Sequence, residues 1–186
     1  MAYAVGAQGG MGDFMRTPVS SESGTTLIET MIALAVLLIA MSGLMTLSGL
    51  ASRTTENNGH LAARTTEDAQ DKMEQLLALR YGDSTSDTTN PITFPANPSG
   101  GTGLSIGGSV NPSAPVAGYV DWLATDGTML GGGVNPPNNW FYERVWQVTQ
   151  FSPTVKLISV TVTTSWAFGK ANLPQSTVTA LKGDGF

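Results

Sequence analysis

Few chemically reactive side chains are spaced as an active site requires. Gly103-Leu-Ser105-Ile-Gly107 has the Gly-x-Ser-x-Gly pattern of a hydrolase nucleophile elbow. The pattern lacks a strand–turn–helix context, and the single histidine, His60, precedes it, against the Ser, acid, His order of those enzymes. Because no second His and no Cys accompany it, we expect His60 to be a solvated helix residue rather than a base or metal ligand. The sequence does not favour an enzyme.

Three other candidate sites are also weak. The glycines from Gly101 to Gly107 open no βαβ unit, so they do not predict a phosphate cradle. Tyr119, Trp122 and Trp140 could form a binding surface, although packing in a sheet core explains them more simply. Oxygen ligands of the kind that Ca²⁺ prefers are present in four aspartates, which no loop spacing groups into a site: Asp83, Asp87, Asp121 and Asp126. We therefore expect these acids to be solvated and the protein to need no metal or other cofactor.

Glu29 has a more unusual setting. No charged residue lies between Glu29 and Arg53, and apolar residues dominate this interval. At about 1.5 Å per helical residue, the apolar run gives roughly 35 Å of helix, enough to cross a bilayer core of about 30 Å. An acid in a membrane span costs about 2.5–3.5 kcal/mol near the bilayer centre and less towards the interface. We therefore expect residues 25–52 to span a membrane and Glu29 to have a partner.

The residues around Glu29 carry a family resemblance. Gly24-Thr25-Thr26-Leu-Ile-Glu29, followed by an apolar helix, resembles the prepilin cleavage site of type IV pilins and type II secretion pseudopilins. The resemblance implies that a prepilin peptidase removes residues 1–24 by cutting between Gly24 and Thr25 and then methylates the amino group of Thr25. It also implies that Glu29 acts in filament assembly. The chain departs from the family at Thr25, where Phe or another large apolar residue is usual, and its leader is poorly basic.

Two further features of the amino-terminal region leave alternatives open. Residues 15–24 alone would make a short leader with Arg16 next to Met15, so we expect Met15 to be the true start. Gly49-Leu-Ala51 has the small-x-small pattern of an ordinary signal peptidase site and lies at the end of the apolar run. Cleavage there would leave a mature protein that begins at Ser52.

Composition excludes several classes of protein. The 186 residues suit one modest domain plus a membrane segment. There is no cysteine, so neither a disulfide nor a thiolate metal site is available. The formal charge of −5 does not indicate nucleic-acid binding, which normally needs a face rich in Lys and Arg.

Residues 53–81 predict an amphipathic second half of the same helix. One face carries Ala62, Thr66, Ala69, Met73, Leu76, Leu77 and Arg80. Arg64 with Asp68, and Asp68 with Lys72, form i,i+4 pairs that we place on the other side. Asn57-Asn58-Gly59 could bend or interrupt the helix, and Gly82 stands where a C′ glycine would end it.

Residues 82–186 predict a loop-rich, antiparallel β domain. Within a long connection at 83–139 we expect one short strand, at residues 118–123, with Val120 and Trp122 on one face. Residues 140–151 and 155–166 alternate and are joined by a hairpin loop at 152–154. In the second of these strands we expect four residues to share the helix-facing side: Ile158, Val160, Val162 and Trp166. A last strand, near residues 176–181, completes the sheet.

These expectations combine into one α+β subunit, in which a long helix with a membrane-spanning first half packs on a small antiparallel sheet. The pattern from Arg144-x-Trp146 through the hairpin also looks like the carboxy-terminal hairpin of PilV-type minor pilins. The resemblance implies a structural minor pilin that enters or primes a type IV pilus, or alternatively a type II secretion pseudopilin. Its implied partners are other pilin or pseudopilin subunits, the prepilin peptidase, an inner-membrane assembly platform and membrane lipid.

The resemblance also implies a location: a single pass through the inner membrane, with the carboxy-terminal domain periplasmic or extracellular, and then the pilus or pseudopilus. An alternative of a different class remains open at this point. The chain could be a binding domain with a single membrane anchor that never polymerises.

Overall fold

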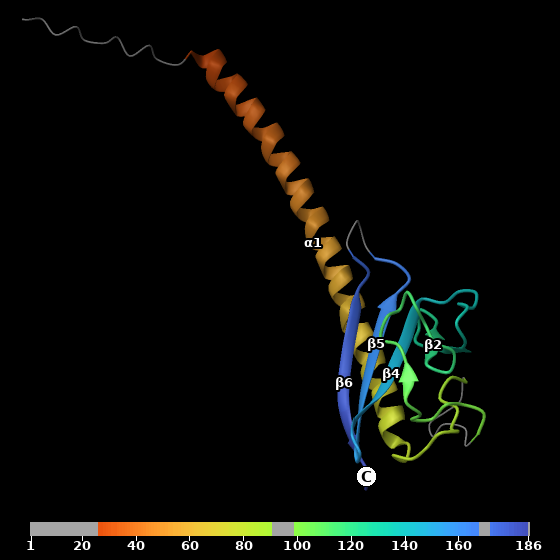
Figure 1. Ribbon diagram of the computed structural model, residues 1–186. Coiled ribbons are helices and arrows are strands. Elements are labelled where there is room, and N and C mark those ends of the chain that lie inside the picture. Colours follow the sequence, from red (N-terminus) through yellow and green to blue (C-terminus); the bar gives the residue numbers. More distant parts are fainter. Residues whose placement is uncertain (1–25, 91–98, 168–171, 186) are drawn as a thin grey trace, which may run out of the picture. The chain divides into compact units, whose positions relative to one another are not determined.

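The computed structural model describes residues 26–90, 99–167 and 172–185 (Figure 1). Helix α1 (Leu27–Ala78) precedes the strands β1 (Gly107–Gly108), β2 (Val120–Leu123), β3 (Met129–Gly132), β4 (Tyr142–Ser152), β5 (Val155–Thr164) and β6 (Gln175–Gly183). The chain divides into two compact units, Met1–Thr46 and Leu47–Phe186.

In the first unit, the described residues form the amino-terminal part of α1. Leu, Ile, Met, Ala and Val favour helix, and the segment contains no proline that would break it. The polar side chains also bond within the helix: the Ser42 hydroxyl donates to the Ile39 carbonyl at 2.8 Å, and the Thr46 hydroxyl donates to the Ser42 carbonyl at 2.9 Å. These hydroxyls therefore need no water partner.

The second unit is an antiparallel sheet with the carboxy-terminal part of α1 packed against it. The strand order is β3-β2-β4-β5-β6, with β1 paired to β4, and every pairing is antiparallel. The β4–β5 hairpin is the longest pairing and runs from Tyr142 opposite Thr164 to Ser152 opposite Val155. The predicted α+β class, with a helix packed on an antiparallel sheet, is therefore confirmed.

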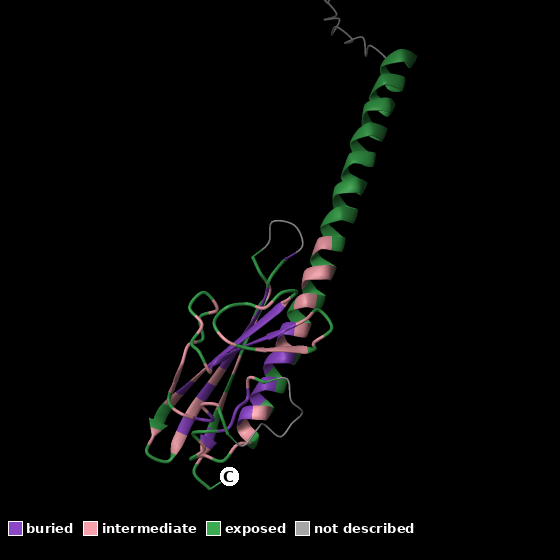
Figure 2. Ribbon diagram, turned by 90° about the vertical axis from the view of Figure 1, so that its right-hand side faces the viewer, coloured by how far each residue is buried: buried purple, intermediate pink, exposed green. Residues whose placement is uncertain are grey.

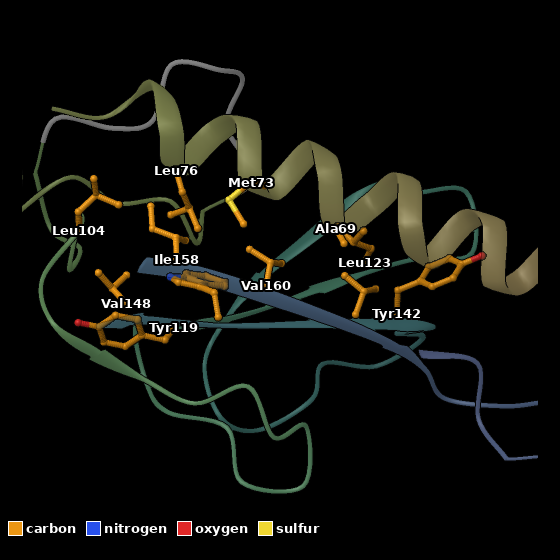
Figure 3. Packing of buried hydrophobic residues seen from close by; sticks show 12 residues of the cluster. Ala69, Met73, Leu76, Leu104, Tyr119, Leu123, Tyr142, Val148, Ile158 and Val160 are labelled. Carbon is orange, nitrogen blue, oxygen red and sulfur yellow. The ribbon is translucent and has the colours of Figure 1, made fainter. Parts of the chain in front are cut away.

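The main core lies between α1 and the sheet (Figure 3). Ala69, Met73 and Leu76 on the helix pack against side chains at alternate positions of β4 and β5, against the last residue of β2 and against two residues of the preceding loops. Those side chains are Leu104, Tyr119, Leu123, Tyr142, Trp146, Val148, Ile158, Val160 and Val162. The helix-facing positions predicted for Ile158, Val160 and Val162 are confirmed.

A smaller cluster packs on the opposite face of the sheet. Val120, Trp122 and Val145 are buried there, with Leu130 and Trp140 packed against them. Val120 and Trp122 share a face as predicted, and the rings of Trp122 and Trp140 meet edge to face with centroids 4.8 Å apart. Packing in a core, the simpler expectation for the loop aromatics, is confirmed for Tyr119 and Trp122, whereas Trp140 is only partly buried.

The glycine-rich loop stacks on the chain that follows α1. The amide of Gly103 donates to the Ser86 carbonyl at 2.9 Å, and the amide of Leu104 donates to the Asp83 carbonyl at 2.8 Å. Gly103 has φ +51°, and a Cβ there would lie 2.3 Å from the Asp83 carboxylate, so only glycine fits this close approach. Gly103 therefore serves the packing of this loop on residues 83–86.

Several expectations about element ends were wrong. The helix runs through Asn57-Asn58-Gly59 without a break and ends at Ala78, before Gly82. Gly82 does not adopt the positive φ of a C′ glycine. The last turn of the helix closes by a bond from the Leu79 amide to the Leu76 carbonyl at 3.2 Å. Strand β5 ends at Thr164, so Trp166 lies beyond it and is half exposed instead of helix-facing.

The region at 83–139 contains more strand than the sequence predicted. Besides β2, which was expected, it forms the short strands β1 and β3. Both are rich in glycine, which is depleted from strands in general, so no β-forming pattern marks them. Their pairing with β4 and β2 supplies the structure that their own residues do not.

Candidate functional site

Glu29 lies in the first turn of α1 and is exposed. Its amide donates to the Thr26 carbonyl at 3.0 Å and lies 3.4 Å from the Thr26 hydroxyl oxygen, so Thr26 caps the helix. Thr26-x-x-Glu29 also has the sequence of a capping box. Helix capping is therefore one role that the local geometry gives to this pair. Gly24 and Thr25, the other predicted site residues, lie outside the described residues.

The first half of α1 presents an uncovered apolar surface. Its large apolar side chains between residues 27 and 50 are exposed by fractions that range from 51% for Leu37 to 80% for Leu27. Figure 2 colours this part of α1 as exposed. By length and composition, α1 is able to cross a membrane, and it lies near the amino terminus. A single such helix is compatible with a single-pass membrane anchor.

A second site, which the sequence reasoning missed, is a group of buried charges between α1 and the sheet. Asp121 of β2 lies directly opposite Arg144 of β4, and its two carboxylate oxygens accept bonds from Arg144 Nε at 2.6 Å and Arg144 Nη2 at 2.9 Å. Lys72 Nζ of α1 donates to Asp121 Oδ2 at 2.7 Å. The side chains of Lys72 and Asp121 have no exposed surface.

The Lys72 ammonium has further partners. It donates to the Thr88 carbonyl and lies 4.1 Å from the ring centroid of Trp146, a cation–π distance. Burial lowers the pKa of Lys72 to about 8, against the opposing effect of Asp121. Burial alone would raise the pKa of Asp121, but Arg144 and Lys72 outweigh it and hold that pKa below its usual value.

Asp68 lies one turn before Lys72 on α1, next to this group, and its negative charge is less well neutralised than that of Asp121. It is 5% exposed, and its Oδ2 has no hydrogen-bond partner among the described residues. Burial raises the pKa of Asp68 to about 6, although Arg144 and Arg64 act in the opposite direction. Asp68 is therefore a source of pH-dependent stability.

These contacts overturn two expectations. Asp68 and Lys72 were placed in exposed i,i+4 pairs, but both are buried, and Lys72 pairs with Asp121. Arg64 instead pairs with Glu67 at 2.8 Å, an i,i+3 contact. Asp121 and Asp87 were both expected to be solvated, but Asp121 is fully buried and Asp87 is only 7% exposed. Lys72 and Asp121 are tolerated in the interior because they neutralise each other, with Arg144 as the third charge of the group.

The remaining candidates lie apart from this group. His60 is exposed on α1, as expected. Ser105 lies in a turn, and its carbonyl accepts a bond from the Tyr119 hydroxyl at 2.9 Å. Asp83 binds the neighbouring amides of Thr85 and Ser86. In the described part of the chain, no three His, Cys, Asp or Glu side chains are grouped to hold a metal ion.

The alternation of side chains along the two strands could have revealed the buried charges from the sequence. Arg144 stands two residues before Trp146 and so shares its face of the strand, while Asp121 alternates with Val120 and Trp122. A basic and an acidic residue at core-facing positions of two strands predict a mutual pair, because neither is stable there alone.

The comparisons with known proteins add no relative: no protein-family model, curated protein or solved structure matches the chain. A long apolar amino-terminal helix and a helix packed on an antiparallel sheet are consistent with a pilin-like architecture.

Proposed function

We propose that the protein is a minor pilin or pseudopilin, a structural subunit that enters or primes a filament assembled from the inner membrane. The observation that carries the proposal is Glu29, an acid in the exposed first turn of a helix that has no other charge before Arg53. It follows a Gly24-Thr25 motif that resembles a prepilin cleavage site. A carboxylate in this setting opposes membrane insertion, so a function is needed to explain it.

Filament assembly supplies a partner for that carboxylate. Cleavage after Gly24 gives Thr25 a free amino group, which is largely cationic at neutral pH. In a growing filament, the Thr25 amino group of an adjoining subunit neutralises Glu29 in a medium of low dielectric and sets the register of one helix against the next. The prepilin peptidase, the assembly platform and the other subunits are the partners on this proposal.

The test must separate the charge of Glu29 from its capping role. We expect Glu29→Val and Glu29→Gln to be cleaved and to reach the membrane, and both to be lost from filaments at least tenfold, because neither carries a charge. Gln still fits the capping-box pattern, whereas Val does not. The measurement is an immunoblot of sheared filaments beside the membrane fraction. Wild-type amounts of Glu29→Gln in the filaments would show that only the cap matters and would refute the assembly role.

Pilus and secretion functions share these residues and are separated by phenotype. Deletion of the coding sequence abolishes or alters pili on the first proposal and blocks export of folded proteins on the second. The minor pilin is the version that we favour, because the Arg144-x-Trp146 pattern and the hairpin that follows it resemble the carboxy-terminal hairpin of PilV-type minor pilins.

A further inference from the structure

A cavity of about 690 Å³ opens on the face of the sheet that points away from α1. The loop after β1, the start of β4 and the facing ends of β5 and β6 contribute its walls. Its polar and aromatic lining includes Asn111, Trp140, Glu143, Thr163, Asn172 and Gln175. Its size suits a small ligand or one long side chain of a partner.

Glu143 is the unusual residue of this lining. It lies between Trp122 of β2 and Thr163 of β5 as a cross-strand neighbour of both, and it is 6% exposed. Its Oε1 is buried and has no hydrogen-bond partner in the described ranges. A buried carboxylate without a partner is costly, and natural proteins seldom keep one without a use.

The electrostatic setting of Glu143 is one-sided. Burial raises the pKa of Glu143 to about 7. Among the described residues that line the cavity, Glu143 is the only charged one. The buried network of Asp121 and Arg144 offers no compensation, because adjacent strand residues point to opposite faces and Arg144 faces α1.

We propose that this cavity binds a monovalent organic cation, an alkylammonium or alkylguanidinium group, with Glu143 as the ion-pair acceptor and Trp140 as an aromatic wall. A cation supplies the charge that the lining lacks, and a guanidinium or ammonium group also donates hydrogen bonds to the unpartnered oxygen. An indole ring is the best aromatic surface for such a cation. The amide and hydroxyl side chains of the lining are suited to orient it. The site lies outside the assembly residues and does not rest on the proposed function.

The binding of a cation at this site has a pH dependence that the binding of a neutral ligand, such as a sugar, does not share. The cation competes with the proton of Glu143, so binding releases that proton at pH values below the pKa of the empty site. With a pKa of about 7, the apparent affinity is expected to rise about tenfold between pH 6 and pH 8. A neutral ligand that accepts a hydrogen bond from the protonated acid would instead bind more weakly as the pH rises.

The experiment is calorimetric titration of the full-length protein in nonionic detergent with butylguanidinium and butylammonium. Phosphate is the buffer, because Tris and imidazole are themselves organic cations. Glu143→Gln is the test variant, since it keeps the shape of the side chain and loses the charge. Glu74→Gln, the same change at an exposed helix position, is the matched control. We expect Glu143→Gln to weaken binding at least tenfold at pH 8 and Glu74→Gln to leave it unchanged.

A second probe distinguishes the source of the cation. A capped peptide with one arginine flanked by glycines presents the same guanidinium group on a polypeptide. Binding of the peptide at least tenfold more tightly than butylguanidinium identifies a side chain of a partner protein as the ligand, while equal binding identifies the free cation as sufficient. Either result supports the site.

Three results would overturn the proposal. The first is unchanged binding of butylguanidinium by Glu143→Gln, and the second is equal binding of neutral pentanamide by the wild type at pH 8. The third concerns Lys170, which lies outside the described residues and is the basic residue nearest to Asn172 in the sequence. If Lys170→Met tightens butylguanidinium binding tenfold or more, the chain supplies its own cation and no external ligand is needed.

Discussion

At the scale of single residues, buried charges differ in how well their surroundings compensate them. Asp121 accepts bonds from both Lys72 and Arg144, so its negative charge is held in place. Asp68 lies nearby with an unpartnered oxygen and a pKa raised to about 6 by burial. The first acid stabilises the fold in its charged form, whereas the second is more stable there when neutral.

We predict that Asp68→Asn stabilises the domain at pH 8. The folded pKa of about 6 lies above the ordinary value of 3.8, so folding favours the protonated acid, and this contribution is lost as pH rises through 6. The full penalty is at most about 3 kcal/mol above that pH. Urea unfolding, monitored by tryptophan fluorescence, should therefore give a higher free energy of unfolding for Asp68→Asn than for wild type at pH 8.

The difference in stability between Asp68→Asn and wild type should shrink by pH 4, where the Asp68 side chain of the folded protein is protonated and therefore neutral, as Asn is. Asp184→Asn, the same change at an exposed site, is the control and should move the midpoint little at either pH. A loss of stability at pH 8 in Asp68→Asn would mean that the attraction of Asp68 to Arg144 exceeds its burial cost.

At the scale of elements, the long periodic segments were predictable and the packed face of the helix was only partly so. Alternation identified β4 and β5, and the apolar run identified the start of α1. The buried residues of α1 are Thr65, Asp68, Ala69, Lys72, Met73 and Leu76, a regular helical face. The apolar periodicity of the sequence identified three of these residues. It placed the packed face at a different angle around the helix, because it assigned Asp68 and Lys72 to solvent.

Long-range pairing explains what the sequence did not reveal. Lys72 is buried because it pairs with Asp121. Asp121 lies 49 residues later in the chain, so the local sequence pattern around Lys72 contains no information about that contact. The strands β1 and β3 depend similarly on the partners that they meet. Of the candidate site, Glu29 was evident from its charge alone, whereas Glu143 needed the register of three strands to be noticed.

We predict that residues 53–186 fold without the apolar segment and that Leu76→Asp destabilises this fragment by about 3–5 kcal/mol. Leu76 has no exposed surface and packs in the cluster between α1 and the sheet, so the new carboxylate would be buried without a partner. Leu181→Asp, at a leucine of β6 that is 57% exposed, is the matched control and should cost little. Thermal unfolding monitored by circular dichroism measures both. Equal melting of Leu76→Asp and the parent fragment would disprove packing of the helix at this point.

At the scale of the whole molecule, processing decides what the apolar segment is for. The exposed apolar side chains between Leu27 and Leu50 form a surface that is unfavourable in water, and a bilayer or neighbouring helices would cover it in a mature protein that keeps this segment. Cleavage after Ala51 would instead remove this segment and release a domain that has its own core. The two outcomes separate a filament subunit from a secreted protein.

We predict that the mature chain begins at Thr25 and carries an N-methyl group. A site placed before the apolar run keeps that run in the product, which a membrane-assembled subunit needs, and mass spectrometry of the membrane-extracted protein measures the terminus directly. Two variants act as opposite controls. Gly24→Asp alters the residue at the prepilin-type site and should leave the leader attached, whereas Ala51→Leu removes a small residue that ordinary signal peptidase requires and should change nothing. A chain that begins at Ser52, with cleavage lost in Ala51→Leu and retained in Gly24→Asp, would refute the filament proposal, because Glu29 would be absent from the mature protein.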